Sequence, residues 1–198
     1  MNLSPLLTVQ EYNKLIDFEN IIFEFYPAGD LRDCLLLHSR QVCRKALDIA
    51  DKTSLPLDRE IIIPGAMLHD IGIFLCDAPG IYCRGSLDYI AHGIAGAALL
   101  REWGVRHNTD MEIFARICER HTGSGLTQKE IEVSNMPLPH RDFLPETCEE
   151  KLICFADKFF SKSGTMTEKS LKKIRCQMAR FGEAPAARFE KLVSLFEC

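Results

Sequence analysis

The chain lacks several features that define whole classes of protein. None of its hydrophobic runs approaches the roughly 18 residues of a membrane-spanning helix, and Met1–Glu11 has no basic segment followed by an apolar one. Lysine and arginine number 24 against 28 acidic residues, which leaves a formal net charge of −4. We therefore expect a cytoplasmic protein with no membrane partner and no nucleic-acid polymer as a partner.

The chain also lacks the cysteine spacing of zinc ribbons and redox motifs. Its nine cysteines are scattered, and no two of them form a CxxC pair. An odd number of cysteines in a chain without an export signal predicts reduced thiols that pack as small apolar residues. Hydrophobic residues make up 46% of the chain, enough to bury a core without disulfides, so one domain is expected over residues 1–198.

What the sequence does contain is a helical repeat. Apolar residues recur every three or four positions, and strictly alternating stretches are almost absent. This pattern predicts an all-α fold, a single compact bundle with few strands or none. Helices are expected at about 8–25, 31–51, 58–72, 87–103, 109–120, from 127, at 148–162, and twice after 165.

Capping residues predict where several of these helices begin and end. Asp58 is a favourable N-cap residue, and Gly72 suits the left-handed position that follows a helix. A threonine followed three residues later by glutamate has the spacing of a capping box, and this pair begins at Thr109, Thr127 and Thr147. We expect each threonine to start a helix.

Six side chains that can bind metal lie on helix faces where the periodicity otherwise predicts core: His38, His69, Asp70, His92, His121 and Asp157. A single histidine on an apolar face is more often a hydrogen-bonded core residue. A buried carboxylate is costly unless it meets a cation, and no lysine or arginine shares the stripes of Asp70 and Asp157. The mixed nitrogen and oxygen set therefore predicts one or two divalent ions of iron, manganese, nickel, cobalt or zinc.

These residues also carry a family resemblance. The ordered elements are His38, His69-Asp70-Ile71-Gly72, Ala91-His92-Gly93, Arg120-His121-Thr122-Gly123 and Asp157. They resemble the signature of HD-domain metal-dependent phosphohydrolases, and the two added histidines resemble the two-metal subset. The similarity covers about 30–162, which implies an HD-domain core there, with an N-terminal helix in 1–29 and C-terminal helices in 165–198 packed on it.

The resemblance implies how the ligands divide. One metal would be held by His38, His69, Asp70 and Asp157, and the second by His92 and His121, with Asp70 bridging. Asp70, His92 and His121 would then serve catalysis, because two metals can share a hydroxide that attacks phosphorus. The implied function is hydrolysis of a phosphoester in a nucleotide or another small phosphorylated metabolite, which would be the partner of the site.

The chain departs from the family pattern at one position. Many relatives have a lysine directly after the HDIG motif that meets the substrate phosphate, and Ile73 stands there instead. Arg120 and Lys158 are the nearest cations by sequence, and His140 and Arg141 lie in a proline-rich loop that could reach the substrate. Each of these side chains also has a plain interpretation as a solvated surface group.

Two other functions stay open at this point. Some proteins with this ligand set hold two irons and oxidise a substrate with dioxygen, and others keep the scaffold as a silent nucleotide-binding module. The spare nitrogens of the histidine ligands need acceptors, for which Glu119 and Asp88 are candidates. The oligomeric state is open as well.

Overall fold

The structure is a computed structural model that describes residues 7–196, so Cys198 and part of Met1–Glu11 lie outside the described residues. Its α-helices are α1 (Val9–Phe25), α2 (Asp30–Ala50), α3 (Arg59–Leu68), α4 (His92–His107), α5 (Glu112–Arg120), α6 (Gln128–Val133), α7 (Cys148–Asp157), α8 (Leu171–Ala179) and α9 (Glu183–Phe196). Short 3₁₀ turns are η1 (Ile73–Leu75), η2 (Pro79–Ile81) and η3 (Tyr89–Ala91). The expected all-α fold is confirmed.

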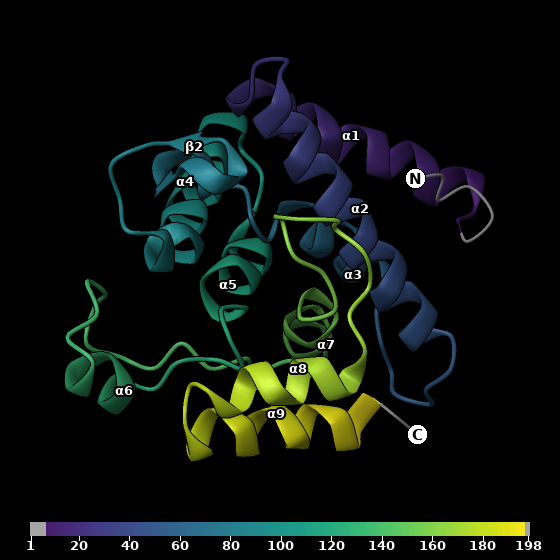
Figure 1. Ribbon diagram of the computed structural model, residues 1–198. Helices are drawn as coiled ribbons and strands as arrows, with labels where there is room; N and C mark the ends of the chain where they lie inside the picture. The colour runs from purple at the N-terminus through teal and green to yellow at the C-terminus, as the bar shows by residue number, and fades with distance from the viewer. Residues whose placement is uncertain (1–6, 197–198) are drawn as a thin grey trace.

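Helix α3 lies inside the bundle, where it contacts α1, α2, α5 and α7 (Figure 1). Its residues from Ile62 to Leu68 are all buried. The sequence accounts for this, since a helix that is apolar on every side is stable only when other helices enclose it. The end of α3 is therefore held in the interior, which is where the HDIG motif begins.

The strand content is as small as the periodicity predicts. Among residues 7–196 the only named strands are β1 (Asp77–Ala78) and β2 (Cys83–Arg84), which form a two-residue antiparallel ribbon with Asp77 opposite Arg84. This ribbon belongs to the loop between α3 and α4.

Three of the expected helix starts are confirmed. The side chain of Asp58 accepts a hydrogen bond from the Glu60 amide at the start of α3. Thr127 and Thr147 form complete capping boxes with the glutamates three residues later, at the starts of α6 and α7. Such local interactions lie within one turn, so they can be recognised without knowledge of the tertiary fold.

Two of the predicted capping roles are wrong, one at a helix start and one at a helix end. Thr109 does not cap α5, because the Asp110 carboxylate accepts the hydrogen bond from the Glu112 amide, at 2.9 Å. Gly72 is not left-handed, since its φ is −87°. A Cβ atom at Gly72 would lie 2.3 Å from main-chain atoms of α4. Glycine is needed there for the close approach of α4, not for the conformation of the turn.

Two of the expected helices also differ in their boundaries. The helix expected at 87–103 begins at His92, after η3, and continues past Gly104 to His107, where the left-handed Asn108 (φ 50°) ends it. The helix expected at 148–162 ends at Asp157. Residues 158–162 therefore leave the helix through a turn at 158–159, and they approach the ends of other helices.

The N-terminal and C-terminal helices pack against the bundle that encloses α3. Helix α1 contacts α3 and α2, while α8 and α9 lie side by side and α9 contacts α7 (Figure 1). Helix α6 stands apart in Figure 1, with a small core of its own formed by Ile131, Leu138 and Phe143. The division into a core at about 30–162 with packed flanks stays a prediction.

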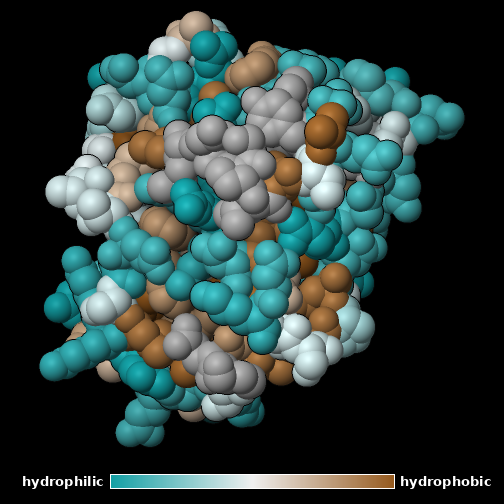
Figure 2. All heavy atoms as spheres, turned by 90° about the vertical axis from the view of Figure 1, so that its right-hand side faces the viewer, coloured by the Kyte–Doolittle hydropathy of each residue, from teal (hydrophilic) through white to brown (hydrophobic). Residues whose placement is uncertain are grey.

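The visible surface is mainly hydrophilic. Figure 2 shows the face on the right of Figure 1, where polar side chains predominate and hydrophobic ones form separate small groups. Within residues 7–196, no helix has the length and apolar composition to cross a bilayer. The eight cysteines among the described residues are all unpaired, as expected.

Candidate metal centre

Helix ends bring the six predicted ligands together. His69 and Asp70 directly follow α3, and His92 is the first residue of α4. His121 directly follows α5, and Asp157 is the last residue of α7, whereas His38 lies within α2. All six residues are buried, with Asp70 completely enclosed. The polar ends of four helices thus meet in the interior, beside the middle of a fifth.

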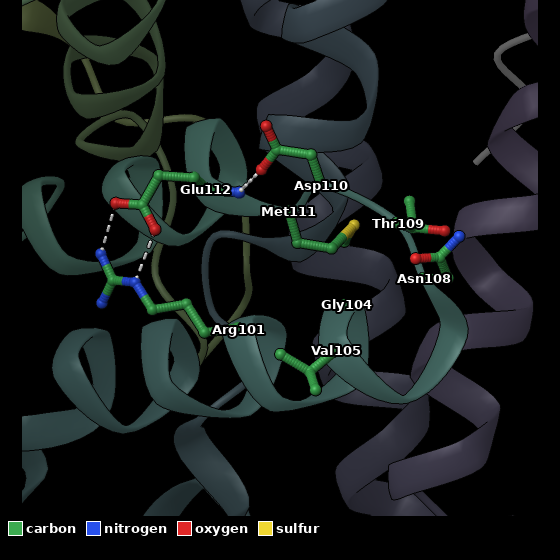
Figure 3. Close-up of a pocket in the computed structure, with 8 residues that line it drawn as sticks. All are labelled: Arg101, Gly104, Val105, Asn108, Thr109, Asp110, Met111 and Glu112. Atoms are coloured by element: carbon green, nitrogen blue, oxygen red, sulfur yellow. Dashed lines mark hydrogen bonds and ion pairs between the residues drawn. The ribbon is translucent and has the colours of Figure 1, made fainter.

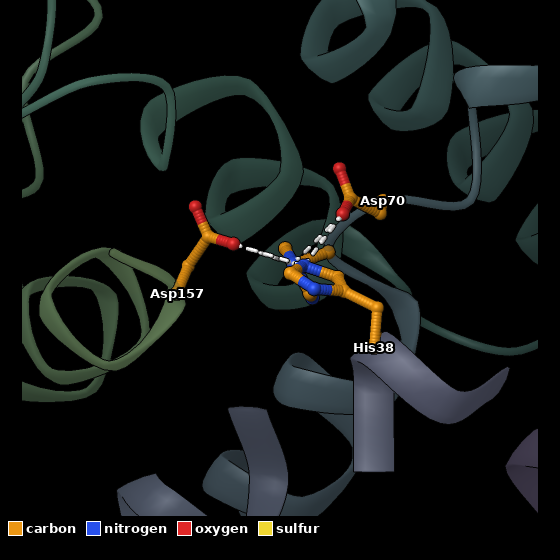
Figure 4. Close-up of side chains that lie close together, drawn as sticks. His38, Asp70 and Asp157 are labelled. Carbon is orange, nitrogen blue, oxygen red and sulfur yellow. Dashed lines mark hydrogen bonds and ion pairs between the residues drawn. The ribbon is translucent and has the colours of Figure 1, made fainter. Parts of the chain in front are cut away.

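The first group consists of His38, His69, Asp70 and Asp157. His38 Nε2 lies 2.9 Å from Asp157 Oδ1 and 3.1 Å from Asp70 Oδ2. His69 Nε2 also lies 3.1 Å from Asp70 Oδ2. Figure 4 shows the two carboxylates pointing from opposite sides toward the imidazole of His38. Four donor atoms therefore converge on one small volume.

The second group consists of Asp70, His92 and His121. Nε2 of His92 and Nε2 of His121 lie 3.0 Å apart, and each is 3.4 Å from Asp70 Oδ1. Asp70 thus turns one oxygen to each group. This is the arrangement that a bridging carboxylate between two ions requires.

Main-chain carbonyls orient three of the histidines. His69, His92 and His121 each place Nδ1 at 2.6–2.7 Å from the carbonyl three residues earlier, of Ala66, Tyr89 and Cys118. A carbonyl can only accept, so each Nδ1 carries a proton, and the neutral form of each imidazole has its lone pair on Nε2. The sequence-based candidates Glu119 and Asp88 are not the acceptors. The acceptors could not be read from side-chain types, because they belong to the helix ends themselves.

This tautomer makes the group fit a metal ion. Nε2 of His92 and Nε2 of His121 face each other at 3.0 Å, yet neither can donate a hydrogen bond while Nδ1 holds the proton. Both oxygens of Asp70 are buried without a well-directed hydrogen bond from the described residues. Lone pairs and carboxylate oxygens that face one another in this way are what a cation stabilises. The cluster is compatible with divalent metal binding.

The structure corrects one premise of the sequence-based prediction. Two lysines do reach the buried carboxylates: Lys158 Nζ lies 2.7 Å from Asp157 Oδ2, and Lys162 Nζ lies 2.5 Å from Asp70 Oδ2. Both come from the segment beyond α7, so they share no helical stripe with either aspartate. Burial of the two carboxylates therefore does not by itself require a metal ion. The inference of a metal site rests on the geometry of the histidines instead.

These charges set the protonation of the site. Burial raises the pKa of Asp70, but Lys162 and His69 outweigh it and hold this pKa well below its usual range. Burial lowers the pKa of His69, yet the two aspartates raise it to about 9. Burial dominates at His92 and lowers its pKa to about 3. A cation at the first group would replace a proton on His69.

The other cations proposed for substrate binding lie elsewhere. Arg120 Nη1 is 2.8 Å from Glu146 Oε1, and Arg141 Nη2 is 3.1 Å from Glu119 Oε2. His140 is exposed. Among the residues that are described, only Lys158 of the four candidates touches one of the six, and the substrate role of each stays a prediction.

A large surface hollow is separate from this centre. It is about 500 Å³ in volume and is lined by the end of α4 and the start of α5, from Arg101 to Glu112. Figure 3 shows Arg101 pointing toward Glu112, with which it forms paired contacts of 2.7 and 2.8 Å. His92 and His121 occupy the opposite ends of the same two helices. The hollow is therefore remote from the metal-competent residues.

Metal binding is expected to stabilise the fold. An ion present at 100 times its dissociation constant contributes about 2.7 kcal/mol, which corresponds to a rise in Tm of roughly 5–11 °C for a chain of this size. We expect this rise on adding manganese or cobalt to chelator-treated protein in differential scanning fluorimetry. Calcium, which prefers oxygen ligands, should change the Tm little. Equal shifts with all three ions would contradict an imidazole-rich site.

Comparison with known proteins places this centre in a family. The model of the HD domain matches residues 35–161. The chain belongs to the HD-domain family. No solved structure shows a significant match. The matched segment contains all six metal-competent residues, which lie between His38 and Asp157.

Curated relatives extend the comparison. The chain is 37% identical to a tRNA (cytidine(56)-2'-O)-methyltransferase of Picrophilus torridus over 80% of this chain and 40% of that protein. It is 32% identical to a protein of the same name from Thermoplasma volcanium, over 65% of this chain and 32% of that protein. An uncharacterized protein, MJ0778 of Methanocaldococcus jannaschii, is 34% identical over 63% of each chain. The HD-domain chain thus spans less than half of the two named methyltransferases.

These relatives correct two expectations. A small phosphorylated metabolite as substrate, and the absence of a nucleic-acid partner, are contradicted by relatives that are named for action on tRNA. The net charge of −4 gave a wrong prediction of the partner, because it sums the charges of the whole chain and does not show where the cations lie. The dioxygen-using and silent nucleotide-binding alternatives gain no support from these names. The HD-domain match and these relatives are compatible with the expected enzyme.

Proposed function

We propose that this HD domain is a metal-dependent phosphoesterase that acts on a phosphoester of tRNA. The observation that carries the proposal is the charge balance of the buried centre. Lys158 and Lys162 already neutralise the two aspartates, through contacts of 2.7 and 2.5 Å. A divalent ion at the first group would replace the His69 proton and add one uncompensated positive charge, and an ion at the second group would add two. Such a centre stabilises an anion, and the phosphodiester of RNA is one.

The residues of the two groups would have different roles in such a reaction. His38, His69 and Asp157 would hold one ion, and His92 and His121 the other, with Asp70 shared. The ions would supply a hydroxide at neutral pH and neutralise charge on the phosphoryl group. The carbonyls behind His69, His92 and His121 keep Nδ1 protonated, so each Nε2 stays directed at an ion.

We propose tRNA as the partner because of the relatives of this chain. Two of them are named as tRNA methyltransferases. The third, MJ0778, has about the same length as this chain, because the aligned residues make up 63% of each protein. The HD part thus occurs apart from the longer proteins, and we carry over the tRNA partner alone. Helix α8 provides exposed cations beside the bundle, namely Lys172 and Lys173. These lysines support contact with a phosphate backbone.

A labelled tRNA tests the proposal directly. We expect protein loaded with manganese, cobalt, zinc or iron to release phosphate from end-labelled tRNA, or to cut the chain, as seen by gel electrophoresis and thin-layer chromatography. The rate should fall at least about 10³-fold in His92→Ala/His121→Ala, because the metals supply about 4 kcal/mol of charge stabilisation. Binding should weaken as salt is increased.

The control separates inactive protein from a wrong proposal. Lys191→Met alters a lysine of α9 that has no part in the centre, and it should keep the wild-type rate. If every metal-loaded preparation leaves all tRNA phosphoesters intact while binding metal normally, the proposed reaction is wrong.

A further inference from the structure

The missing lysine after the HDIG motif has consequences for substrate binding. Ile73 occupies that position and its side chain is completely buried, so no cation reaches the substrate from there. A phosphoester held at a two-metal centre still needs a donor for its remaining oxygens. Another part of the fold must then supply that cation.

Lys162 is placed to supply it. It lies in the segment beyond α7, and its side chain is only 11% exposed. Its Nζ lies 2.5 Å from Asp70 Oδ2, the oxygen that faces the first group, and 5.9 Å from the ring centre of Tyr89. Tyr89 in turn stacks on His92, with ring centres 4.7 Å apart. Lys162 therefore touches the carboxylate shared by both groups.

A cavity opens onto the same lysine. It has a volume of about 400 Å³, and its lining comes from the segment Ala78–Ile81, from Tyr89 and from Ser161, Lys162 and Ser163. The two serines of the lining carry hydroxyl groups, which can donate and accept hydrogen bonds. This cavity gives a substrate a route to the side chain that contacts Asp70.

Lys158 has different contacts. Its Nζ is held between Asp157 Oδ2 at 2.7 Å and the carbonyl of His121 at 3.0 Å. It does not line the cavity. Of the two lysines at the centre, only Lys162 both contacts Asp70, the shared ligand, and lines this cavity.

We propose that Lys162 binds a phosphate oxygen of the substrate, taking the place of the lysine that Ile73 replaces. A metal ion and the ammonium group would compete for Asp70 Oδ2, because both are cations on one oxygen. With a metal ion on Asp70, Lys162 would be released from that carboxylate toward the cavity, where a phosphate would compensate its charge. This inference rests on the proposed function and assigns the subsite that the phosphate occupies.

Isothermal titration of manganese-loaded protein with inorganic phosphate tests the subsite without any turnover. We expect Lys162→Met to weaken phosphate binding about 10–100-fold, because it removes a charged hydrogen bond. Lys162→Arg should restore most of the affinity. Lys191→Met removes the same charge from the exposed face of α9 and should bind phosphate as the wild type does.

Two further measurements keep the outcome decisive. Metal analysis must give the same manganese content for all variants, and Lys162→Met should bind manganese more tightly because a competing cation is gone. Wild-type phosphate affinity in Lys162→Met, or no phosphate binding by the metal-loaded wild type, would overturn the subsite. A protein that binds phosphate through Lys162 but leaves tRNA intact would instead overturn the proposed reaction alone.

Discussion

Replacing Asp70 with asparagine is expected to remove divalent metal from both groups at once. Asp70 directs Oδ2 to His38 and His69 and Oδ1 to His92 and His121, so a single change weakens every shared contact. Metal content, measured by plasma mass spectrometry, should fall below about a tenth of wild type, since ligand loss of several kcal/mol exceeds a factor of ten. Hydrolysis of tRNA should be lost with it.

The same change should also destabilise the fold. It leaves the buried ammonium of Lys162 without its counter-charge, which costs about 3–5 kcal/mol when one partner of a buried pair is removed. A lower Tm could by itself explain lost metal. The double variant Asp70→Asn/Lys162→Met separates the two effects, because it should regain stability while the metal content stays low.

A matched control uses the helix that carries His38. Asp33→Asn alters an exposed aspartate of α2 by the same single charge and should keep both metal content and Tm. If Asp70→Asn binds the wild-type amount of metal, the shared position of Asp70 has no functional meaning.

Adding one methyl group at Gly72 is expected to disrupt the second group selectively. The Cβ atom of Gly72→Ala would lie 2.3 Å from the His92 carbonyl oxygen and from the Gly96 nitrogen, distances that real Cβ atoms do not show. Helix α4 must then move away, and His92 moves with it. We expect a loss of about 3 kcal/mol in stability, seen as a Tm lowered by roughly 6–12 °C.

Metal stoichiometry distinguishes local from general damage. The first group draws no ligand from α4, so Gly72→Ala should retain one ion where the wild type binds two. Gly80→Ala is the stability control, because a Cβ there meets nothing within 4 Å. A Gly72→Ala protein with unchanged Tm and two ions would contradict the close packing of α4 on the HDIG turn.

Much of the local structure is encoded within single turns. Asp58, Thr127 and Thr147 cap their helices as expected, because a capping side chain and its amide are at most three residues apart. Thr109 failed the same test, because Asp110 is closer to the first free amide and takes its hydrogen bond. Where two polar residues compete for one amide, spacing alone does not decide between them.

The ligand set could be predicted because its members are anomalies in a regular pattern. Histidine and aspartate at core positions, such as His38 within α2 and Asp157 at the end of α7, stand out against the 3.6-residue repeat. Lys162 could not be found this way. It lies outside any helix, and only the chain path beyond Asp157 brings it to Asp70.

By itself, the sequence determined the helices, their capped starts and the kinds of side chain that face the interior. The tertiary structure decided which atoms meet: the carbonyls that orient three imidazoles, the two lysines that neutralise the aspartates, and the approach of α4 to Gly72. The reason is the separation along the chain over which each kind of interaction acts. Periodicity and capping act over a few residues, whereas charge balance and close packing depend on segments that meet only after the chain has folded.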